Sequence, residues 1–320
     1  MGAIVRHPDV STRSFHGLVT SSLQMGALFE KVRRAGRSDA TVLIRGESGT
    51  GKELVATALH AESPRAAHPL QAVNCATFTS QMLASELFGH VRGAFTGAVR
   101  DRQGLLALAN HGTLFLDEVA ELPLELQARL LRVLQARRFT PVGSGAEQVV
   151  DVRFVSATNA ALRRGVAEGW FREDLMYRLR VVVLYLPRLV ERAGDVEALT
   201  WHWIDLFNAR GGRQLHGISA TAWEAVRAYG WPGNVRELRN NLEQAFVLGE
   251  GPVLRLEELA PEVREEDVPC AAPASTLEGL QRDQLLAAFQ ATGGHRGQMA
   301  ERLGISRATL YRRLKKHALI

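Results

Sequence analysis

The sequence has few cysteines, few aromatic residues and no long apolar run. Only two cysteines occur among its 320 residues, so a framework of disulfide bonds is excluded and a reducing compartment is expected. The longest apolar run covers residues 181–186, which is too short for a membrane helix of about 20 residues. The N-terminus lacks the basic and apolar stretches of a signal peptide. We therefore expect a cytoplasmic protein without a membrane partner.

An excess of either charge is also absent from most of the chain. The net charge is +5, and residues 277–320 account for all of it, with eight Lys or Arg against three Asp or Glu. A basic end segment points to a polyanionic partner there. The remaining composition, with 46% apolar and 23% charged residues, is that of a globular protein. The length suggests about two domains.

Strand and helix patterns alternate from about residue 18, after a short, weakly patterned segment at 1–17. Interleaved strands and helices predict a parallel sheet covered on both faces. From about 188 the pattern becomes wholly helical, and the stretch 261–276 contains three prolines and is expected to be a linker. Strands are expected at 40–46, 69–75, 112–118, 150–159 and 181–187, and the helices include 52–61 and 122–138.

The segment GESGTGKE follows the first of these strands and opens a helix, which is the setting of a P-loop. Its glycines let backbone N–H groups surround phosphate oxygens, and Lys52 is expected to reach the β and γ phosphates. The usual motif ends in Ser or Thr as a Mg²⁺ ligand. Glu53 stands there instead, so Mg²⁺ is expected to rely on Thr50, Asp117 and water. The predicted nucleotide-binding residues of this segment are Gly46, Glu47, Ser48, Gly49, Thr50, Gly51, Lys52 and Glu53.

Polar residues also end the next strands. Asp117 and Glu118 close the strand at 112–118, where one carboxylate suits the metal and the second suits polarising the attacking water. A helix N-cap is the alternative for this pair, and the preceding P-loop favours the catalytic interpretation. Thr158 and Asn159 end the strand at 150–159 and are candidates for sensing the γ-phosphate.

Six segments in order resemble the central domain of bacterial sigma-54-dependent transcriptional activators. They are GESGTGKELVA, VNCAT, ELFGHVRGAFTGA, GTLFLDEV, FREDLMYRL and WPGNVRELRN. The resemblance covers about 18–260 and implies an AAA+ P-loop NTPase, with an α/β part at 18–187 and a helical lid at 188–260. It implies the cofactors ATP and Mg²⁺, with hydrolysis used to remodel closed complexes of sigma-54 RNA polymerase into open ones.

The resemblance also implies roles for single residues. Asn74 would hold Glu118 inactive until the signal arrives, and Arg236 would read the nucleotide from the lid. Arg172 and Arg178 match the region of the arginine fingers, which act on a neighbouring subunit. Pairing with adjacent acids on a surface helix is the alternative for these two. The loop that would grip sigma-54 consists of Gly93, Ala94, Phe95, Thr96, Gly97 and Ala98.

The family further implies self-assembly, as a hexamer when active and a dimer when inactive. The chain departs from the family at Arg180, Arg188, Val190 and Gly194, which puts the details of subunit contact in doubt. No sensor domain precedes the motor in this sequence, so control by a separate regulatory protein is one expectation. An AAA+-fold DNA-binding regulator that does not act through sigma-54 is the alternative function, and the intact loop at 93–98 argues against it.

The basic end at 277–320 is predicted to form a small all-α domain of the Fis-like helix-turn-helix type. Gly304 suits the tight turn, and Ser306 is a natural N-cap for the last helix. Its first turn is expected to meet base edges of upstream promoter DNA, and its later basic residues are expected to contact phosphates. The DNA-binding candidates are Ser306, Arg307, Thr309, Arg312, Arg313, Lys315 and Lys316.

Overall fold

The computed structural model of this chain describes residues 3–6, 12–264 and 299. The chain divides into two compact units, 1–264 and 265–320, and the first holds nearly every described residue. The DNA-binding candidates between Ser306 and Lys316 lie outside the described residues. Within the described part, no helix is long and apolar enough to cross a membrane.

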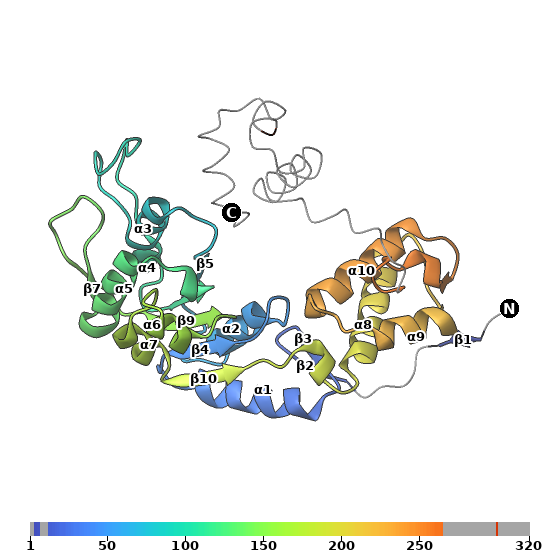
Figure 1. Ribbon diagram of the computed structural model, residues 1–320. Coiled ribbons are helices and arrows are strands. Elements are labelled where there is room, and N and C mark those ends of the chain that lie inside the picture. Colours follow the sequence, from blue (N-terminus) through green and yellow to red (C-terminus); the bar gives the residue numbers. More distant parts are fainter. Residues whose placement is uncertain (1–2, 7–11, 265–298, 300–320) are drawn as a thin grey trace. The chain divides into compact units, whose positions relative to one another are not determined.

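A five-stranded parallel sheet forms the centre of the α/β part, in the order β10-β4-β9-β6-β5 (Figure 1). All five strands lie within the ranges that the sequence predicts. Parallel strands covered on both faces need apolar residues on both faces, and β4 is fully buried apart from its last residue. The strands are β4 (Val42–Arg45), β5 (Leu70–Asn74), β6 (Thr113–Asp117), β9 (Arg153–Thr158) and β10 (Val182–Tyr185).

Alternate residues of the strands enter two separate cores. Val42 and Ile44 pack with α1 and α2 on one face, whereas Leu43 packs with α3 to α7 on the other, as the two-residue period of a strand requires. The helices on these faces are α1 (Leu23–Gly36), α2 (Lys52–Ala61), α3 (Ser80–Phe88), α4 (Leu105–Leu108), α5 (Leu124–Ala136), α6 (Leu162–Ala167) and α7 (Glu173–Leu179). The fold is therefore the expected three-layer α/β arrangement.

Short elements connect these layers. The hairpin β2-β3 precedes α1, and the hairpin β7-β8 follows α5. Single helical turns of the 3-10 type lie after β6, after β10 and near the end of the described chain. These elements are β2 (Arg13–Phe15), β3 (Leu18–Thr20), β7 (Arg138–Phe139), β8 (Gln148–Val149), η1 (Val119–Glu121), η2 (Leu189–Glu191) and η3 (Leu256–Glu258).

The lid has its own core, which includes Trp201, Trp223 and Trp231. It is helical as predicted, but it also contains a small sheet in the order β1-β11-β12, which corrects the expectation of a wholly helical segment. β1 belongs to the segment 1–17, whose weak pattern predicted no place in the lid. β1 pairs with β11 only in the folded chain. Its two apolar residues, Ile4 and Val5, therefore carry no local signal for a strand. The lid elements are α8 (Asp195–Arg210), α9 (Ala220–Ala228), α10 (Asn234–Leu248), β1 (Ile4–Val5), β11 (Gly217–Ser219) and β12 (Val253–Leu254).

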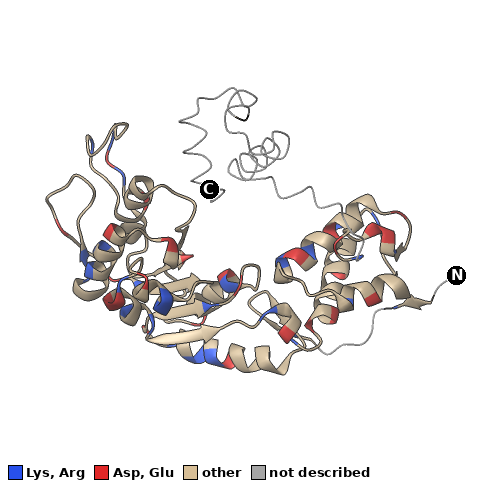
Figure 2. Cartoon of the chain, viewed as in Figure 1, with Lys and Arg blue, Asp and Glu red and all other residues tan. Residues whose placement is uncertain are grey.

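Charged side chains of both signs are interspersed over the described part (Figure 2). This distribution agrees with the absence of a net charge excess before residue 277.

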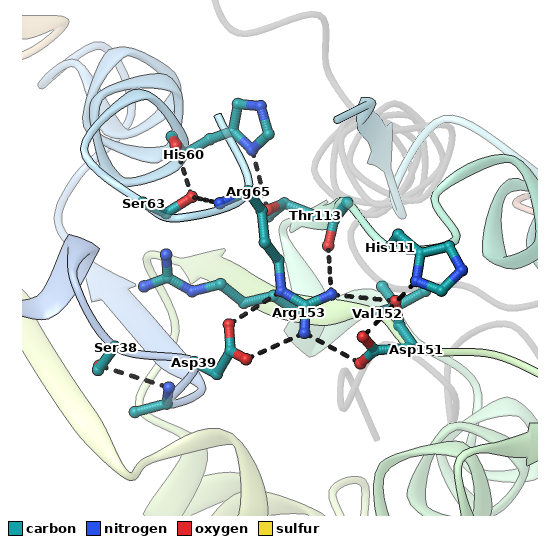
Figure 3. A network of polar contacts seen from close by, with 12 residues as sticks. Ser38, Asp39, His60, Ser63, Arg65, His111, Thr113, Asp151, Val152 and Arg153 are labelled. Atoms are coloured by element: carbon teal, nitrogen blue, oxygen red, sulfur yellow. Dashed lines mark hydrogen bonds and ion pairs between the residues drawn. The ribbon is translucent and has the colours of Figure 1, made fainter. Parts of the chain in front are cut away.

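A polar network joins α1, α2 and the starts of β6 and β9 (Figure 3). Arg65 bridges two carboxylates, with Nε 2.9 Å from Asp39 Oδ1 and Nη2 2.9 Å from Asp151 Oδ1. The nearby Arg153 is 1% exposed and donates to the carbonyls of Ala35, Gly36 and Leu59. These carbonyls lie in the last turns of α1 and α2. A cation is favourable there because it faces the negative end of the helix dipole. The network thus fixes both helices at the edge where the strands begin.

Candidate active site

A cavity of about 460 Å³ lies at the opposite edge, where β5 and β6 end. The P-loop, these strand ends and lid helix α10 contribute its walls. A volume of this size suits a small-molecule ligand. The residues that line it are Ser48, Gly49, Gly51, Lys52, Glu53, Leu54, Asn74, Asp117, Glu118, Trp203, Val235, Arg236, Arg239 and Asn240.

The P-loop reaches this cavity through two left-handed glycines. Gly49 has φ +77° and Gly51 has φ +103°, which glycine adopts without the steric cost of a Cβ. α2 then begins at Lys52, so the N-terminal N–H groups and the positive end of the helix dipole are at the cavity. The Lys52 side chain is only 8% exposed, and its Nζ lies 3.0 Å from the Gly46 carbonyl oxygen.

Glu118 is held between the P-loop and the end of β9. Its Oε1 lies 3.2 Å from Lys52 Nζ, and its Oε2 accepts a hydrogen bond of 3.3 Å from the backbone N of Asn159. The backbone of Glu118 has φ +49°, a strained conformation of the kind that clusters at functional sites. Asn159 is exposed, and the Thr158 side chain is buried and accepts from the backbone N of Ala160.

Asp117 lies on the same wall with an unpaired oxygen. Its Oδ2 accepts a hydrogen bond of 3.1 Å from Asn74 Nδ2, whereas its buried Oδ1 has no hydrogen-bond partner among the described residues. Burial, and then the adjacent Glu118 carboxylate, raise the pKa of Asp117, while Lys52 opposes this. A buried carboxylate oxygen without a donor is suited to a hard cation.

The lid supplies Arg236 to the cavity. Its Nη1 donates a 2.8 Å hydrogen bond to Ser48 Oγ. This contact brings a guanidinium from α10 against the P-loop, although the two residues are 188 positions apart. The expected grouping of Lys52, Glu118 and Arg236 around one cavity is therefore present.

Two residues differ from their expected positions. The family resemblance pairs Asn74 with Glu118, but Asn74 bonds Asp117, because β5 and β6 place Asn74 and Asp117 side by side in register. Thr50 is expected to be a metal ligand, but its hydroxyl donates to the Glu47 carbonyl at 2.8 Å and the residue is 1% exposed. In this structure the Thr50 side chain stabilises the P-loop and does not line the cavity.

The two arginine-finger candidates lie away from the cavity of their own chain. Arg172 forms an ion pair with Asp174, with Nη2 2.8 Å from Oδ2, which is the surface pairing that the sequence leaves as an alternative. The Asp174 carboxylate raises the pKa of Arg172 accordingly. Arg178 lies in the last turn of α7 and is exposed. Neither arginine lines the cavity.

The loop at 93–98 is a tight turn that leaves the α/β part after α3. Gly93 N donates to the Ala98 carbonyl at 2.8 Å, and Gly93 and Gly97 have φ of +81° and +100°. The ring of Phe95 contacts the His90 ring at a centroid distance of 5.0 Å. Gly93, Thr96 and Gly97 are exposed, Ala94 and Phe95 are half-buried, and Ala98 is 6% exposed.

Two residues that contact the P-loop are absent from the predicted site. The sequence also did not predict five of the residues that line the cavity, namely Leu54, Trp203, Val235, Arg239 and Asn240. Asn234, the first residue of α10, donates from Nδ2 to Glu47 Oε2 at 3.2 Å and to the Ser48 carbonyl at 3.1 Å. The buried Arg192 donates from Nη2 to the Thr50 carbonyl at 2.8 Å, and burial lowers the pKa of its guanidinium. The sequence PGN gave a turn signal at Asn234, but neither residue carried a signal for contact with the P-loop.

Comparison with known proteins agrees with this geometry. Residues 18–185 match the family model of the sigma-54 interaction domain, 190–276 match the AAA+ ATPase lid domain, and 276–317 match the bacterial regulatory protein Fis family. The chain is 41% identical to the regulatory protein AtoC of Escherichia coli (strain K12), with 98% of this chain and 70% of AtoC covered. It is 42% identical to the alginate biosynthesis transcriptional regulatory protein AlgB of Pseudomonas aeruginosa, with 97% and 70% covered.

Solved structures of NtrX from Brucella abortus are also similar. The complex with ADP has a TM-score of 0.71 at 35% identity, covering 93% of this chain and 69% of NtrX. The complex with ATP has a TM-score of 0.70 at 36% identity, covering 93% of this chain and 68% of NtrX. These matches extend over both the α/β part and the lid. The chain belongs to the family of sigma-54-dependent transcriptional activators, as an AAA+ ATPase with a Fis-type DNA-binding helix-turn-helix.

Proposed function

We propose that the cavity binds ATP with Mg²⁺ and hydrolyses it to convert closed complexes of sigma-54 RNA polymerase into open ones. The observation that carries the proposal is the meeting of Lys52, Asp117, Glu118 and Arg236 around one cavity at the N-terminus of α2. Phosphates bind such helix ends through backbone N–H groups and the helix dipole. ADP and ATP are the ligands named for the similar NtrX structures.

Asp117 is the residue that we propose holds Mg²⁺, because its buried Oδ1 has no donor within the described residues. Glu53 adds a second carboxylate on the cavity wall, whereas the Thr50 hydroxyl is engaged with Glu47. When bound, Mg²⁺ neutralises charge on the phosphates. Burial and then the Glu118 carboxylate raise the pKa of Asp117, and a cation at this position would offset both effects on the ionised form.

The remaining roles follow from charge and position. Lys52 binds the β and γ phosphates, and Glu118 accepts a hydrogen bond from the attacking water and orients it. Lys52 now lies 3.2 Å from Glu118 Oε1, so binding of phosphate to Lys52 frees the carboxylate for water. Arg236 adds a guanidinium from the lid, which couples lid position to the bound nucleotide.

Arg172 and Arg178 act on the site of a neighbouring subunit in this proposal. Both are exposed and neither lines the cavity of its own chain, which supports a role in trans. A guanidinium at the γ-phosphate stabilises charge in the transition state. The assembly that brings it there is a ring, and we propose the hexamer of the family.

The loop at 93–98 is the proposed contact with sigma-54. Thr96 and Gly97 are exposed at its tip, and Phe95 is half-buried against His90. Gly93 and Gly97 both have positive φ, which makes the tight turn possible. Ala98 is buried, so it supports the loop and is not part of the contact.

The proposal is tested with Thr96→Ala in purified protein. ATP hydrolysis is measured first, and conversion of closed to open complexes on a sigma-54 promoter is measured next. We expect ATP hydrolysis within about twofold of the wild type, because Thr96 does not line the cavity. Open complexes should fall at least tenfold, which is about 1.4 kcal/mol.

Val99→Ala is the matched control, because Val99 is 78% exposed and lies just outside the loop. It should leave both activities unchanged. If Thr96→Ala forms open complexes at the wild-type rate, the assignment of the loop is wrong. If the wild-type protein hydrolyses ATP without forming any open complex, the proposed use of that hydrolysis is wrong.

A further inference from the structure

Helix α5 carries two polar side chains that are withdrawn from solvent, the buried Gln127 and the partly buried Arg129. Its buried apolar residues, among them Leu126 and Leu130, belong to one core. Gln127 is nevertheless 0% exposed, and the guanidinium of Arg129 is desolvated enough to lower its pKa. Burial of such groups is costly unless they are hydrogen-bonded, and both side chains have partners outside α5.

Gln127 joins the segment after Glu118 to the segment of Arg172. Its Nε2 donates to the carbonyl of Leu122 at 2.7 Å and to that of Trp170 at 3.0 Å. Its Oε1 accepts a hydrogen bond of 2.8 Å from the backbone N of Arg172. Leu122 follows η1, which begins directly after Glu118. One side chain therefore links α5 to the segment that follows Glu118 and to the backbone of Arg172, a proposed arginine finger.

Arg129 joins α5 to the bases of two loops. The first is the loop at 93–98, and the second is the loop at 140–147 between β7 and β8. Its guanidinium lies over the ring of Phe88 at 3.9 Å from the centroid, and its Nη2 donates to the Thr140 carbonyl at 2.8 Å. Phe88 ends α3, from which the loop at 93–98 departs, and Thr140 follows β7. The cation–π contact and the hydrogen bond hold both positions against the same side chain.

The two loops are themselves connected beyond Arg129. Val142 N donates to the Gly89 carbonyl at 2.9 Å, and Val91 N donates to the Val142 carbonyl at 3.1 Å. A Cβ on Gly143 would lie 2.6 Å from the Cβ of Ala94, so the second loop packs closely against the first. In Figure 1 the two loops leave the same side of the α/β part, next to α5.

We infer that Gln127 and Arg129 are positioning residues through which α5 transmits changes at the ATP site to the loop at 93–98. A helix of 13 residues is about 20 Å long and moves as a unit. Movement of Glu118 or Arg172 shifts α5 through Gln127, and Arg129 carries this shift to Phe88 and Thr140. The inference rests on the proposed contact of this loop with sigma-54.

The test uses Arg129→Ala and compares open complexes formed with ATP hydrolysed. We expect hydrolysis within about twofold of the wild type and at least tenfold fewer open complexes for each ATP hydrolysed, which is about 1.4 kcal/mol. Arg129→Lys should recover part of the loss, because an ammonium also lies over an aromatic ring and donates to Thr140. Gln135→Ala is the matched control, since Gln135 lies on the same helix and is exposed, and it should change neither activity.

A second readout needs no polymerase. Trypsin cleaves after the exposed Arg92 and Arg100, which flank the loop at 93–98. Addition of a non-hydrolysable ATP analogue should change this cleavage rate in the wild type and leave it unchanged in Arg129→Ala. The inference is overturned if the analogue affects both proteins equally, if it affects neither, or if hydrolysis and open complexes fall by the same factor in Arg129→Ala. A wild type with nucleotide-dependent cleavage but no open complexes contradicts the proposed function instead.

Discussion

Replacement of Asn234 by alanine tests whether the lid holds the P-loop in place. Asn234 is 0% exposed, and its Oδ1 accepts a 2.8 Å hydrogen bond from the backbone N of Leu189. Its Nδ2 donates to Glu47 and to the Ser48 carbonyl. Alanine leaves the Leu189 N–H and the Ser48 carbonyl without this partner, at about 1–3 kcal/mol for each buried group.

The backbone adds a second cost to this substitution. Asn234 has φ +54°, a left-handed conformation that asparagine tolerates and that costs alanine roughly 1–2 kcal/mol. We therefore expect Asn234→Ala to lower the free energy of unfolding by about 3–8 kcal/mol, a large share of the usual 5–15 kcal/mol. Asn234→Gly loses the same hydrogen bonds without the backbone strain, so it should be about 1 kcal/mol more stable than Asn234→Ala.

Urea unfolding followed by tryptophan fluorescence measures these changes, because Trp201, Trp203, Trp223 and Trp231 all lie in the lid segment. ATP affinity is measured alongside it and should fall about tenfold in Asn234→Ala. Asn208→Ala is the control, because Asn208 bonds the backbone of Leu215 within the lid. It should lower stability and leave ATP affinity unchanged.

Three outcomes would refute this reasoning. A loss of less than 1 kcal/mol in Asn234→Ala contradicts the argument from buried hydrogen bonds. Equal stability of the alanine and glycine variants contradicts the argument from φ. An equal loss of ATP affinity in Asn208→Ala shows that general loosening of the lid, rather than the contact with Ser48, weakens nucleotide binding.

Three further predictions concern other parts of the chain. Glu118→Gln should bind ATP as the wild type does and hydrolyse it at least about 100-fold more slowly, whereas the exposed Glu121→Gln should be unaffected; equal rates would exclude Glu118 as the catalytic carboxylate. Burial lowers the pKa of His60 from its ordinary 6.5, so the unfolded chain binds more protons below that pH and stability should fall as the pH drops through 6.5. His60→Gln should flatten this part of a plot of unfolding free energy against pH. Removal of 276–320 should abolish site-specific DNA binding in a filter assay and preserve ATP hydrolysis, and retained site-specific binding would contradict the DNA-binding assignment.

Much of the α/β part follows from local sequence patterns. The strands that end at Arg45, Asp117 and Thr158 are apolar runs between turn signals, and all lie within their predicted ranges. α2 covers the predicted 52–61 residue for residue, because glycine and lysine define its start and the apolar period defines its length. The P-loop and the Asp117–Glu118 pair can be predicted from the sequence for the same reason, since their chemistry depends on residue type at fixed spacing.

The partners of these residues were less predictable. The family resemblance pairs Asn74 with Glu118, but Asn74 bonds Asp117. The register of β5 and β6 decides which residues lie side by side at the strand ends, and it places Asn74 beside Asp117. Thr50 was assigned to the metal from residue type alone, and only the fold shows its hydroxyl bonded to the Glu47 carbonyl. The type of side chain limits which hydrogen-bond partners are possible, and the tertiary structure determines which of them lies within bonding distance.

The sequence by itself determined the family and the motor fold, and it predicted the phosphate site and the loop, because each depends on motifs of consecutive residues. The tertiary structure alone decided how these parts are joined, through the contacts of Asn234 with the P-loop, Gln127 with Arg172 and Arg129 with Thr140. Each of these contacts ends on a backbone group. Every residue carries the same backbone N–H and carbonyl groups except proline, which lacks the N–H, so no residue pattern marks them as partners until the chain is folded.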